Sequence, residues 1–265
     1  MLIAPNNIAF TISYIDVHWY GILMSLAMLI GLFVIFFVRN KYFKEISTDN
    51  ICDIAFILIV LGLLSARLYY VILDFDYFEK HPFEILAIWK GGISIQGAII
   101  GGILAGYYIT KINKLNFFRY ADLFCFGLVS GQVIGRWGNF FNAEAFGLPT
   151  NLPWGQYIPY SLRPENFQNF ECFHPTFLYE SILNLILLIC LYIYLKKKDI
   201  NRKDGIIFCL YLIGYSIIRI LVETIRVDSV LNIGIFHIAH ITAIIIIIFA
   251  ISLMFLLKKE DKQIL

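Results

Sequence analysis

The chain has 265 residues, of which 60% are hydrophobic and only 15% are charged. A soluble domain is close to half apolar and a quarter charged, so this composition is typical of a protein that crosses a membrane several times. The formal net charge of +2 is too small to indicate a nucleic-acid-binding protein, and the sequence contains no basic patch with interleaved aromatic residues.

Seven stretches of the sequence are long and apolar enough to cross a bilayer as helices, which takes about 20 mostly apolar residues. They lie at about 17–38, 50–73, 91–110, 117–135, 174–195, 204–224 and 233–257. The preceding sequence, MLIAPNNIAF, lacks a basic region, so we expect no cleaved signal peptide. We therefore predict an all-α integral membrane protein with seven transmembrane helices and a single membrane domain, residues 1–265.

The basic residues predict the orientation of these helices, because cytoplasmic loops are rich in Lys and Arg. With the N-terminus outside and the C-terminus in the cytoplasm, 14 of the 21 basic residues fall on the inner side. These are Arg39, Lys41, Lys44, Lys111, Lys114, Arg119, Lys196, Lys197, Lys198, Arg202, Lys203, Lys258, Lys259 and Lys262. Residues 74–90 and 136–173 then lie outside, where their length, aromatic residues and prolines predict a small cap or re-entrant arms.

Polar residues lie close to the outer ends of the first and third predicted helices. The first begins with VHWYG, in which Tyr20 suits the lipid–water interface. The third begins with GGISIQGAIIG, whose small residues four apart let helices pack closely. Gln96 adds a neutral amide there, which serves either as an interhelical hydrogen-bonding group or as part of a site.

The stretch GRWGNFFNAEAFG follows the fourth predicted helix, at residues 135–147. Polar groups at membrane depth are costly and usually functional. The planar guanidinium of Arg136 can bind a phosphate through two parallel hydrogen bonds. Three further polar residues add donors and an acceptor for hydroxyl groups or a peptide backbone: Asn139, Asn142 and Glu144. Glycines such as Gly147 allow a ligand to approach the backbone closely. We therefore interpret this stretch as a binding site for an anionic lipid headgroup.

Charged and polar residues also follow a helical spacing in the sixth predicted helix, which contains YSIIRILVETIR. Tyr215, Arg219 and Glu223 are spaced by four residues, and Arg226 follows three later, so we expect all of them on one helix face. Two interpretations fit. The residues form an ion pair that lets the helix tolerate its charges, or they join Arg136 in an anion site near the outer surface.

Histidines occur in the fifth and seventh predicted helices. The fifth begins with HPTFLYE, which places His174 and Glu180 near the outer surface, and the buried Glu180 needs a partner. In the seventh, His237 and His240 lie three residues apart. No Cys or carboxylate accompanies these two, so we predict no metal site.

Six motifs in this order resemble those of the phosphatidylglycerol–prolipoprotein diacylglyceryl transferases. They are VHWYG (17–21), ARLYY (66–70), GGISIQGAIIG (91–101), GRWGNFFNAEAFG (135–147), HPTFLYE (174–180) and YSIIRILVETIR (215–226). The resemblance implies a multi-pass enzyme of the bacterial cytoplasmic membrane with its active site near the outer face. It implies transfer of the diacylglyceryl group of phosphatidylglycerol to the lipobox cysteine thiol of a preprolipoprotein, forming a thioether and releasing glycerol phosphate. No metal or organic cofactor is implied.

The resemblance also implies residue roles. Arg136 and Arg219 hold the phosphate and neutralise the leaving group, and Glu223 orients Arg219. Residues carried over as lipid-binding are Arg136, Asn139, Asn142, Glu144, Gly147, Arg219 and Tyr20, and those carried over as catalytic are Arg136, Arg219, Gln96, Glu223 and Tyr215.

Gln96 departs from the family, in which many members have a histidine that has been proposed as the general base. An amide cannot take the thiol proton, so either another residue such as His174 or His18 is the base or the arginines make a thiolate without one. Two other functions stay open: an anionic-lipid transporter or flippase, and a lipid-binding membrane protein without catalysis.

Overall fold

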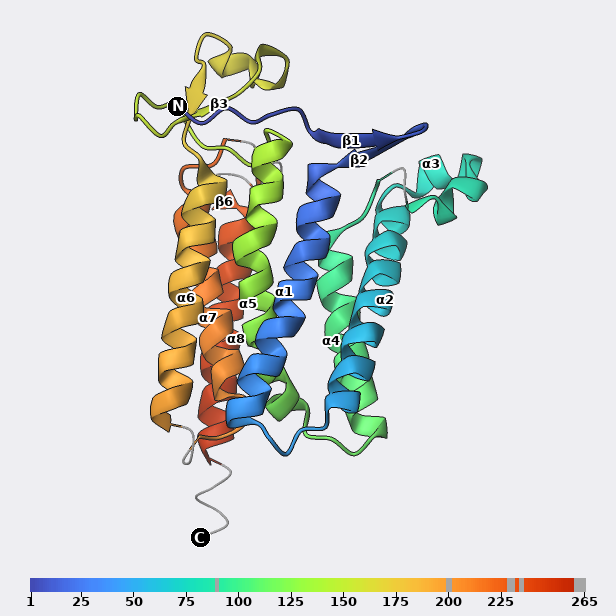
Figure 1. Cartoon of the computed structure of the whole chain (residues 1–265), viewed down its shortest axis with the longest axis vertical. Helices are drawn as coiled ribbons and strands as arrows, with labels where there is room; N and C mark the ends of the chain where they lie inside the picture. Colours follow the sequence, from blue (N-terminus) through green and yellow to red (C-terminus); the bar gives the residue numbers. More distant parts are fainter. Residues whose placement is uncertain (89–90, 199–201, 228–231, 234–235, 260–265) are drawn as a thin grey trace. The chain divides into compact units, whose positions relative to one another are not determined.

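The computed structural model describes residues 1–88, 91–198, 202–227, 232–233 and 236–259. The chain divides into two compact units (Figure 1). Unit 1 consists of Met1–Tyr42 and Ala121–Leu265, and unit 2 of Phe43–Tyr120. The single membrane domain stays a prediction. Of the residues and ranges named from the sequence, residues 89–90 and Lys262 and the side chains of Lys198 and His237 lie outside the described part.

Seven helices of the described chain are long and apolar enough to span a membrane. They are α1 (Trp19–Tyr42), α2 (Thr48–Leu73), α4 (Ile95–Ile112), α5 (Phe117–Phe141), α6 (Thr176–Lys198), α7 (Ile206–Glu223) and α8 (Ile238–Lys259). The seven predicted helices are therefore confirmed, whereas their orientation in a membrane stays a prediction.

Four helix boundaries differ from those predicted by four residues or more. Helix α1 ends at Tyr42 rather than near residue 38, α8 begins at Ile238 rather than near residue 233, and the other two shifts lie at predicted site residues. Helix α5 continues to Phe141 rather than ending near residue 135, so Arg136 lies on a helix and not in a loop. No proline interrupts the chain there, and two glycines do not break a helix that packs on its neighbours. Helix α4 begins at Ile95, because Gly91 and Gly92 take φ values of 85° and 74°, which a right-handed helix excludes.

Short strands and turns complete the fold, which is mostly rather than entirely helical. The described strands form three antiparallel pairs: β1 (Ile8–Ile12) with β2 (Ile15–His18), β3 (Gln156–Tyr157) with β4 (Cys172–Phe173), and β5 (Asn232–Ile233) with β6 (Phe236–His237). The short helices are α3 (Phe75–Lys80), η1 (Pro82–Leu86), η3 (Tyr160–Leu162) and η4 (Glu165–Phe167). Within the two predicted outer segments, residues 75–86 and 156–173 thus contain short helices or strands, and their place outside the membrane stays a prediction.

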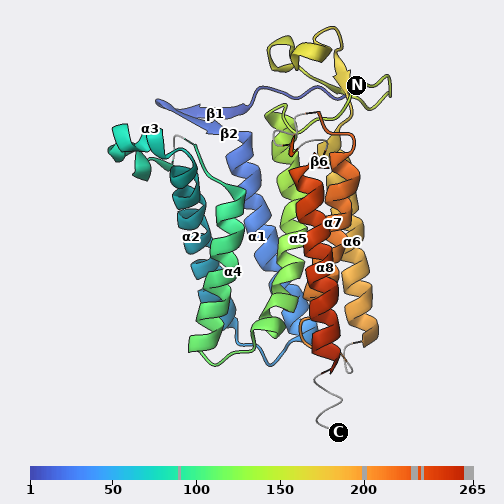
Figure 2. The ribbon, with the colours of Figure 1, turned by 180° about the vertical axis from the view of Figure 1, so that it is seen from behind.

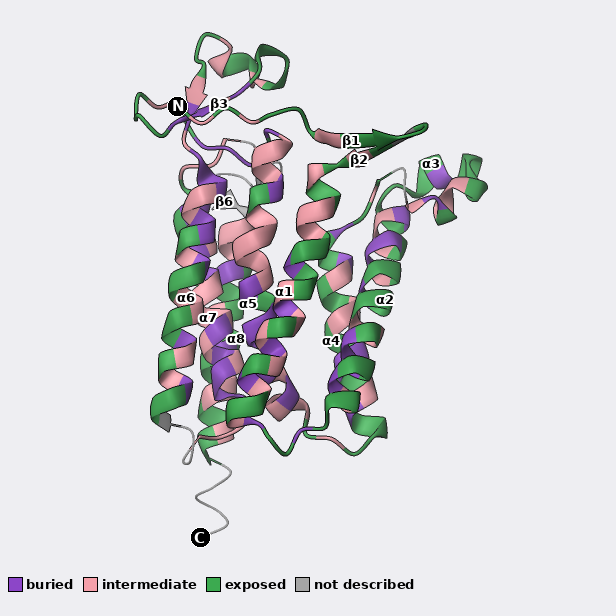
Figure 3. Cartoon of the chain, in the orientation of Figure 1, coloured by how far each residue is buried: buried purple, intermediate pink, exposed green. Residues whose placement is uncertain are grey.

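Unit 1 contains five of the long helices, and α7 packs against both α6 and α8 (Figures 1 and 2). Leu123, Phe126 and Val129 on α5 are fully buried. Figure 3 shows further buried positions on the helices of unit 1. Residues 142–175, which we call the cap, connect α5 to α6 and have a small core of their own around Phe146 and Phe173. We call the end of unit 1 beside the cap the cap end.

At the end of unit 1 opposite the cap, a buried carboxylate fixes the position of α7 along the length of α5. Asp122 on α5 is fully buried and accepts hydrogen bonds from the backbone N–H groups of Gly205 (2.9 Å) and Phe208 (2.8 Å). These groups belong to the first turn of α7, where free N–H groups and the helix dipole favour a negative charge. The same contact thereby fixes which residues of α5 and α7 meet at the cap end.

Unit 2 pairs α2 with α4 through small residues, as predicted. A Cβ atom at Gly97 would lie 2.5 Å from the backbone oxygen of Ser65, so this position has room for glycine alone. Arg67 on α2 is buried and donates to the carbonyl oxygens of Glu84 (2.5 Å), Ile85 (2.9 Å), Gly91 (2.7 Å) and Gly92 (2.7 Å). It therefore clamps the connection that leads into α4.

Candidate active site

Four charged residues from three helices meet at the cap end of unit 1. Arg136 Nη2 on α5 lies 2.6 Å from Glu180 Oε1 on α6. Arg219 Nη1 on α7 lies 3.6 Å from Glu180 Oε2, and Arg219 Nη2 lies 2.8 Å from Glu223 Oε2. Glu180 therefore joins both arginines. We call these residues (Arg136, Glu180, Arg219 and Glu223) the ion-pair cluster.

The exposure of the ion-pair cluster is uneven. The side chains of Arg136 and Arg219 are 23% and 20% exposed, whereas those of Glu180 and Glu223 are 3% and 6% exposed. The carboxylates thus lie behind the guanidinium groups and compensate their charge, which offsets the cost of burying four ions. The arginine side chains stay partly exposed, and guanidinium N–H donors suit an anionic ligand.

Tyr215 links the ion-pair cluster to the deeper part of α7. Its hydroxyl accepts a hydrogen bond from Arg136 Nη2 at 3.4 Å. The predicted face of α7 with Tyr215, Arg219 and Glu223 is therefore confirmed, since all three take part in one network. The prediction was wrong for Arg226, because α7 ends at Glu223 and Arg226 lies beyond it, in a β-bridge with Gly147.

The end of α5 and the start of the cap form a second polar group. Asn139 Nδ2 donates to Glu144 Oε1 at 2.8 Å, and Asn142 Nδ2 donates to the same oxygen at 3.4 Å. The backbone N–H of Glu144 donates a hydrogen bond to the carbonyl oxygen of Asn139 at 3.0 Å. Both residues that flank Glu144 have positive φ, 50° at Ala143 and 55° at Ala145, so a tight turn presents the exposed carboxylate.

The predicted glycines pack against the chain itself. A Cβ atom at Gly147 would lie 2.8 Å from the carbonyl oxygen of Ile225 and 2.9 Å from His174 Cβ. A Cβ atom at Gly138 would lie 2.8 Å from the ring of Tyr20, which is 37% exposed. Tyr20 thus lies against α5 one residue from Asn139, while Gly147 holds the cap close to the end of α7.

Gln96 belongs to unit 2, at the first turn of α4. Its Oε1 accepts a hydrogen bond from Ser94 Oγ at 2.6 Å, and its side chain is exposed. His174, one of the alternative bases, contacts the hydroxyl of Tyr179 through Nδ1 at 3.1 Å, and Trp154 Nε1 donates to that hydroxyl at 3.2 Å. His174 is thus held within the cap network.

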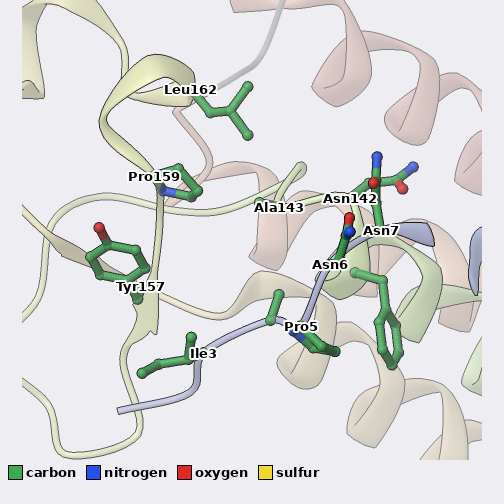
Figure 4. A pocket seen from close by; sticks show the side chains of 11 residues that line it. Ile3, Pro5, Asn6, Asn7, Asn142, Ala143, Tyr157, Pro159 and Leu162 are labelled. Atoms are coloured by element: carbon green, nitrogen blue, oxygen red, sulfur yellow. The ribbon is translucent and has the colours of Figure 1, made fainter. Parts of the chain in front are cut away.

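Asn142 also lines a pocket of about 310 Å³ between the N-terminal segment and the cap. Figure 4 shows the amide side chains of Asn6, Asn7 and Asn142 grouped on one side of it. Apolar and aromatic residues such as Tyr157 complete the lining. None of the ion-pair cluster lines this pocket, so we place the chemistry at the cluster and not here.

Glu180 is the residue whose role the sequence left unassigned. Its only signal was a carboxylate five residues into an apolar helix, which requires a partner. Sequence spacing could not identify that partner, because Arg136 and Arg219 lie on other helices. Gln132 and Tyr211, described below, gave no signal of their own, as isolated polar residues are common in membrane helices.

A family model for prolipoprotein diacylglyceryl transferase matches residues 7–256, which include all seven long helices except the last turn of α8. The chain belongs to this family. The match also includes the ion-pair cluster, the turn at Glu144 and Gln96.

Curated relatives agree with the family model. The chain is 41% identical to a phosphatidylglycerol–prolipoprotein diacylglyceryl transferase of Synechocystis, over 97% of this chain and 92% of the relative. It is 42% identical to that of Trichormus variabilis, over 91% and 86%. A relative of the same name in Thermotoga maritima is 37% identical, over 96% of this chain and 85% of the relative.

Proposed function

We propose that this protein transfers the diacylglyceryl group of phosphatidylglycerol to a cysteine thiol of a prolipoprotein. Membership of the prolipoprotein diacylglyceryl transferase family and the names of its relatives support this activity. The structural observation that carries it is the pair of partly exposed arginines, Arg136 and Arg219, joined by the buried Glu180. Such a pair suits one phosphodiester, which each guanidinium can contact through two N–H groups.

The reaction is a displacement at carbon. The cysteine sulfur forms a bond to the glycerol carbon that carries the phosphate, and the bond from that carbon to the phosphate oxygen breaks. Glycerol phosphate leaves with the electron pair, and the thiol proton passes to solvent or to the departing phosphate. Arg136 and Arg219 stabilise the charge that grows on the leaving group, while Glu180 and Glu223 hold the two guanidinium groups in place.

The second polar group fits the rest of the headgroup. The headgroup glycerol has two hydroxyls, which need both acceptors and donors. Glu144 supplies an exposed carboxylate, and Asn139 and Asn142 supply amides beside it. Tyr20 flanks Asn139 from α1 and completes the lipid-binding set, and Gly147 shapes it by holding the cap close.

Gln96 acts as a hydrogen-bonding positioner in this proposal. Ser94 donates to its Oε1, which turns the amide and leaves both N–H groups of Nε2 free to donate. An amide takes no proton, so the thiolate must form otherwise. A cysteine thiol has a pKa near 8.5, and neighbouring cations lower the pKa of a thiol.

We propose that the cap end faces outward from the bacterial cytoplasmic membrane and that the C-terminus is cytoplasmic. Basic residues support this orientation, since Arg39 and Lys41 lie in the last turn of α1 and Lys258 and Lys259 in the last turn of α8, both at the end opposite the cap. The active site then lies near the outer face, where a secreted prolipoprotein and the lipid meet.

One assay tests the function. Purified protein receives phosphatidylglycerol and a lipobox peptide, with the Cys→Ser peptide as control, and mass spectrometry follows diacylglyceryl addition. We expect product and glycerol phosphate with the cysteine peptide alone. Lipid movement between leaflets without any peptide product would instead identify a transporter, and lipid binding without either would identify a non-catalytic protein.

A further inference from the structure

A second layer of polar side chains lies one helical turn from the ion-pair cluster, on the side away from the cap. Gln132 precedes Arg136 by four residues on α5, and Tyr211 precedes Tyr215 by four on α7. Gln132 Nε2 donates to the hydroxyl of Tyr211 at 2.9 Å, one turn below the contact between Arg136 and Tyr215. Helices rise about 1.5 Å per residue, so the two layers are about 6 Å apart.

Helix α6 contributes to the same layer. Arg136 and Glu180 meet, and Ser181 Oγ donates to the carbonyl oxygen of Val133 at 2.7 Å, so α5 and α6 run past each other in opposite directions. One turn further from the cap, this register sets Asn184 at the level of Gln132. Asn184 is fully buried, and among the described residues neither of its polar side-chain atoms has a hydrogen-bond partner.

The members of this layer differ in access. Gln132 is partly exposed, although its Oε1 is enclosed and has no hydrogen-bond partner among the described residues, whereas Tyr211 is buried and Asn184 fully enclosed. The amide nitrogen of Gln132 has two N–H donors, of which Tyr211 takes one. Gln132 thus keeps one donor, is held at a fixed orientation by a buried tyrosine, and lies on the same face of α5 as Arg136.

We propose that Gln132 is a lipid-contacting residue that donates a hydrogen bond to an acyl ester carbonyl of the donor phospholipid. This inference rests on the proposed function. One ester is attached to the carbon next to the reacting one. Its carbonyl carbon is five covalent bonds from phosphorus, a span of about 6 Å in an extended chain. A phosphate at the arginines, with acyl chains running away from the cap, places that ester at the level of Gln132.

The contact would set the position of the reacting carbon. The arginines hold the phosphate on one side of this carbon, and Gln132 holds the ester on the other. With two points of the lipid held, the carbon–oxygen bond that breaks is oriented for attack by sulfur. A single contact to the headgroup would leave this bond free to rotate. Tyr211 is a positioning residue in this arrangement, since it acts through Gln132.

The test compares phosphatidylglycerol with its diether analogue of the same chain length, which lacks the ester carbonyls. Mass spectrometry measures kcat/KM for the lipobox peptide with each lipid. For the wild-type protein we expect the diester to be used about two- to tenfold better, the range that one neutral hydrogen bond supports. In Gln132→Leu this preference falls to about one, because kcat/KM decreases more with the diester than with the diether.

Asn184→Leu is the matched control, because it removes an amide at the same level that is enclosed by protein. We expect it to change kcat/KM with both lipids by the same factor. An unchanged ester preference in Gln132→Leu, or the same change of preference in both variants, would overturn the proposal. Tyr211→Phe, which frees the Gln132 amide, supplies the same comparison if Gln132→Leu does not fold. No product from the wild-type protein with the diester would instead reject the proposed function.

Discussion

Glu180 on α6 forms ion pairs with both arginines of the site, Arg136 on α5 at 2.6 Å and Arg219 on α7 at 3.6 Å. Each arginine reaches the site from a different helix, so this single carboxylate determines how far apart the two guanidinium groups lie. Its burial also means that a substrate meets the arginines and not the carboxylate. In the proposed anion site, Glu180 therefore supports the two arginines without contacting the lipid itself.

Glu180→Gln tests this support. The amide keeps the size of the side chain and removes the charge, which leaves two partly buried arginines less compensated. Breaking one side of a buried ion pair typically costs about 3–5 kcal/mol, so we expect a lower unfolding temperature together with a reduced kcat. Glu180→Asp keeps the charge on a shorter side chain and should lose less of both. Wild-type kinetics in Glu180→Gln would show that the arginines do not need this carboxylate.

Arg136→Ala and Arg219→Ala remove the groups that we propose to stabilise the leaving phosphate. Loss of one such donor typically costs about 10²–10³ in kcat, and we expect losses of this size with phosphatidylglycerol and the lipobox peptide. Lysine at either position keeps a charge without the bidentate geometry and should recover only part of the rate. Arg119→Ala is the control, because Arg119 pairs with Glu45 in unit 2, outside the proposed site. Equal rates in Arg119→Ala and Arg136→Ala would argue against a specific role.

Gln96→Ala tests whether Gln96 only orients a substrate or is required for the reaction itself. If the arginines make the thiolate and Gln96 only orients a substrate, Gln96→Ala retains most of its activity, and Ser94→Ala, which frees the Gln96 amide, has a similar small effect. Steady-state rates beside those of the arginine variants check this. A Gln96→Ala protein as inactive as Arg136→Ala would refute the positioner role and would require a direct part for Gln96 in the reaction.

Sequence spacing predicted the site best where its residues share one helix. Tyr215, Arg219 and Glu223 follow a four-residue period, and Arg136 was recognisable because an arginine at membrane depth requires a function. The partnership of Arg136 with Glu180 depends on how α5 packs against α6, which no local pattern encodes. The β1–β2 pair was missed for a local reason, since Ser13 takes a positive φ of 57° in a turn that has no glycine or asparagine to signal it.

Gly147→Ala tests the packing of the cap on α7. The added methyl group would lie 2.8 Å from the carbonyl oxygen of Ile225 and 2.9 Å from His174 Cβ, and both atoms belong to constrained parts of the chain. Overpacking of this kind costs about 1–3 kcal/mol, so we expect a lower unfolding temperature. Gly135→Ala is the matched control, because there the methyl group meets only Met24 Sδ at 3.5 Å and alanine favours the helix. A Gly147→Ala protein as stable as Gly135→Ala would mean that the cap can shift to make room.

Arg67→Lys tests whether an arginine outside the ion-pair cluster is structural. Its guanidinium donates to four backbone carbonyl oxygens, those of Glu84, Ile85, Gly91 and Gly92. An ammonium group is a point charge with three donors and cannot reproduce this planar arrangement. We expect Arg67→Lys to increase hydrogen exchange in residues 84–88 and 91–96 and to lower the unfolding temperature, while the affinity for phosphatidylglycerol changes little. A large loss of lipid affinity without faster exchange would instead show that Arg67 binds the lipid directly.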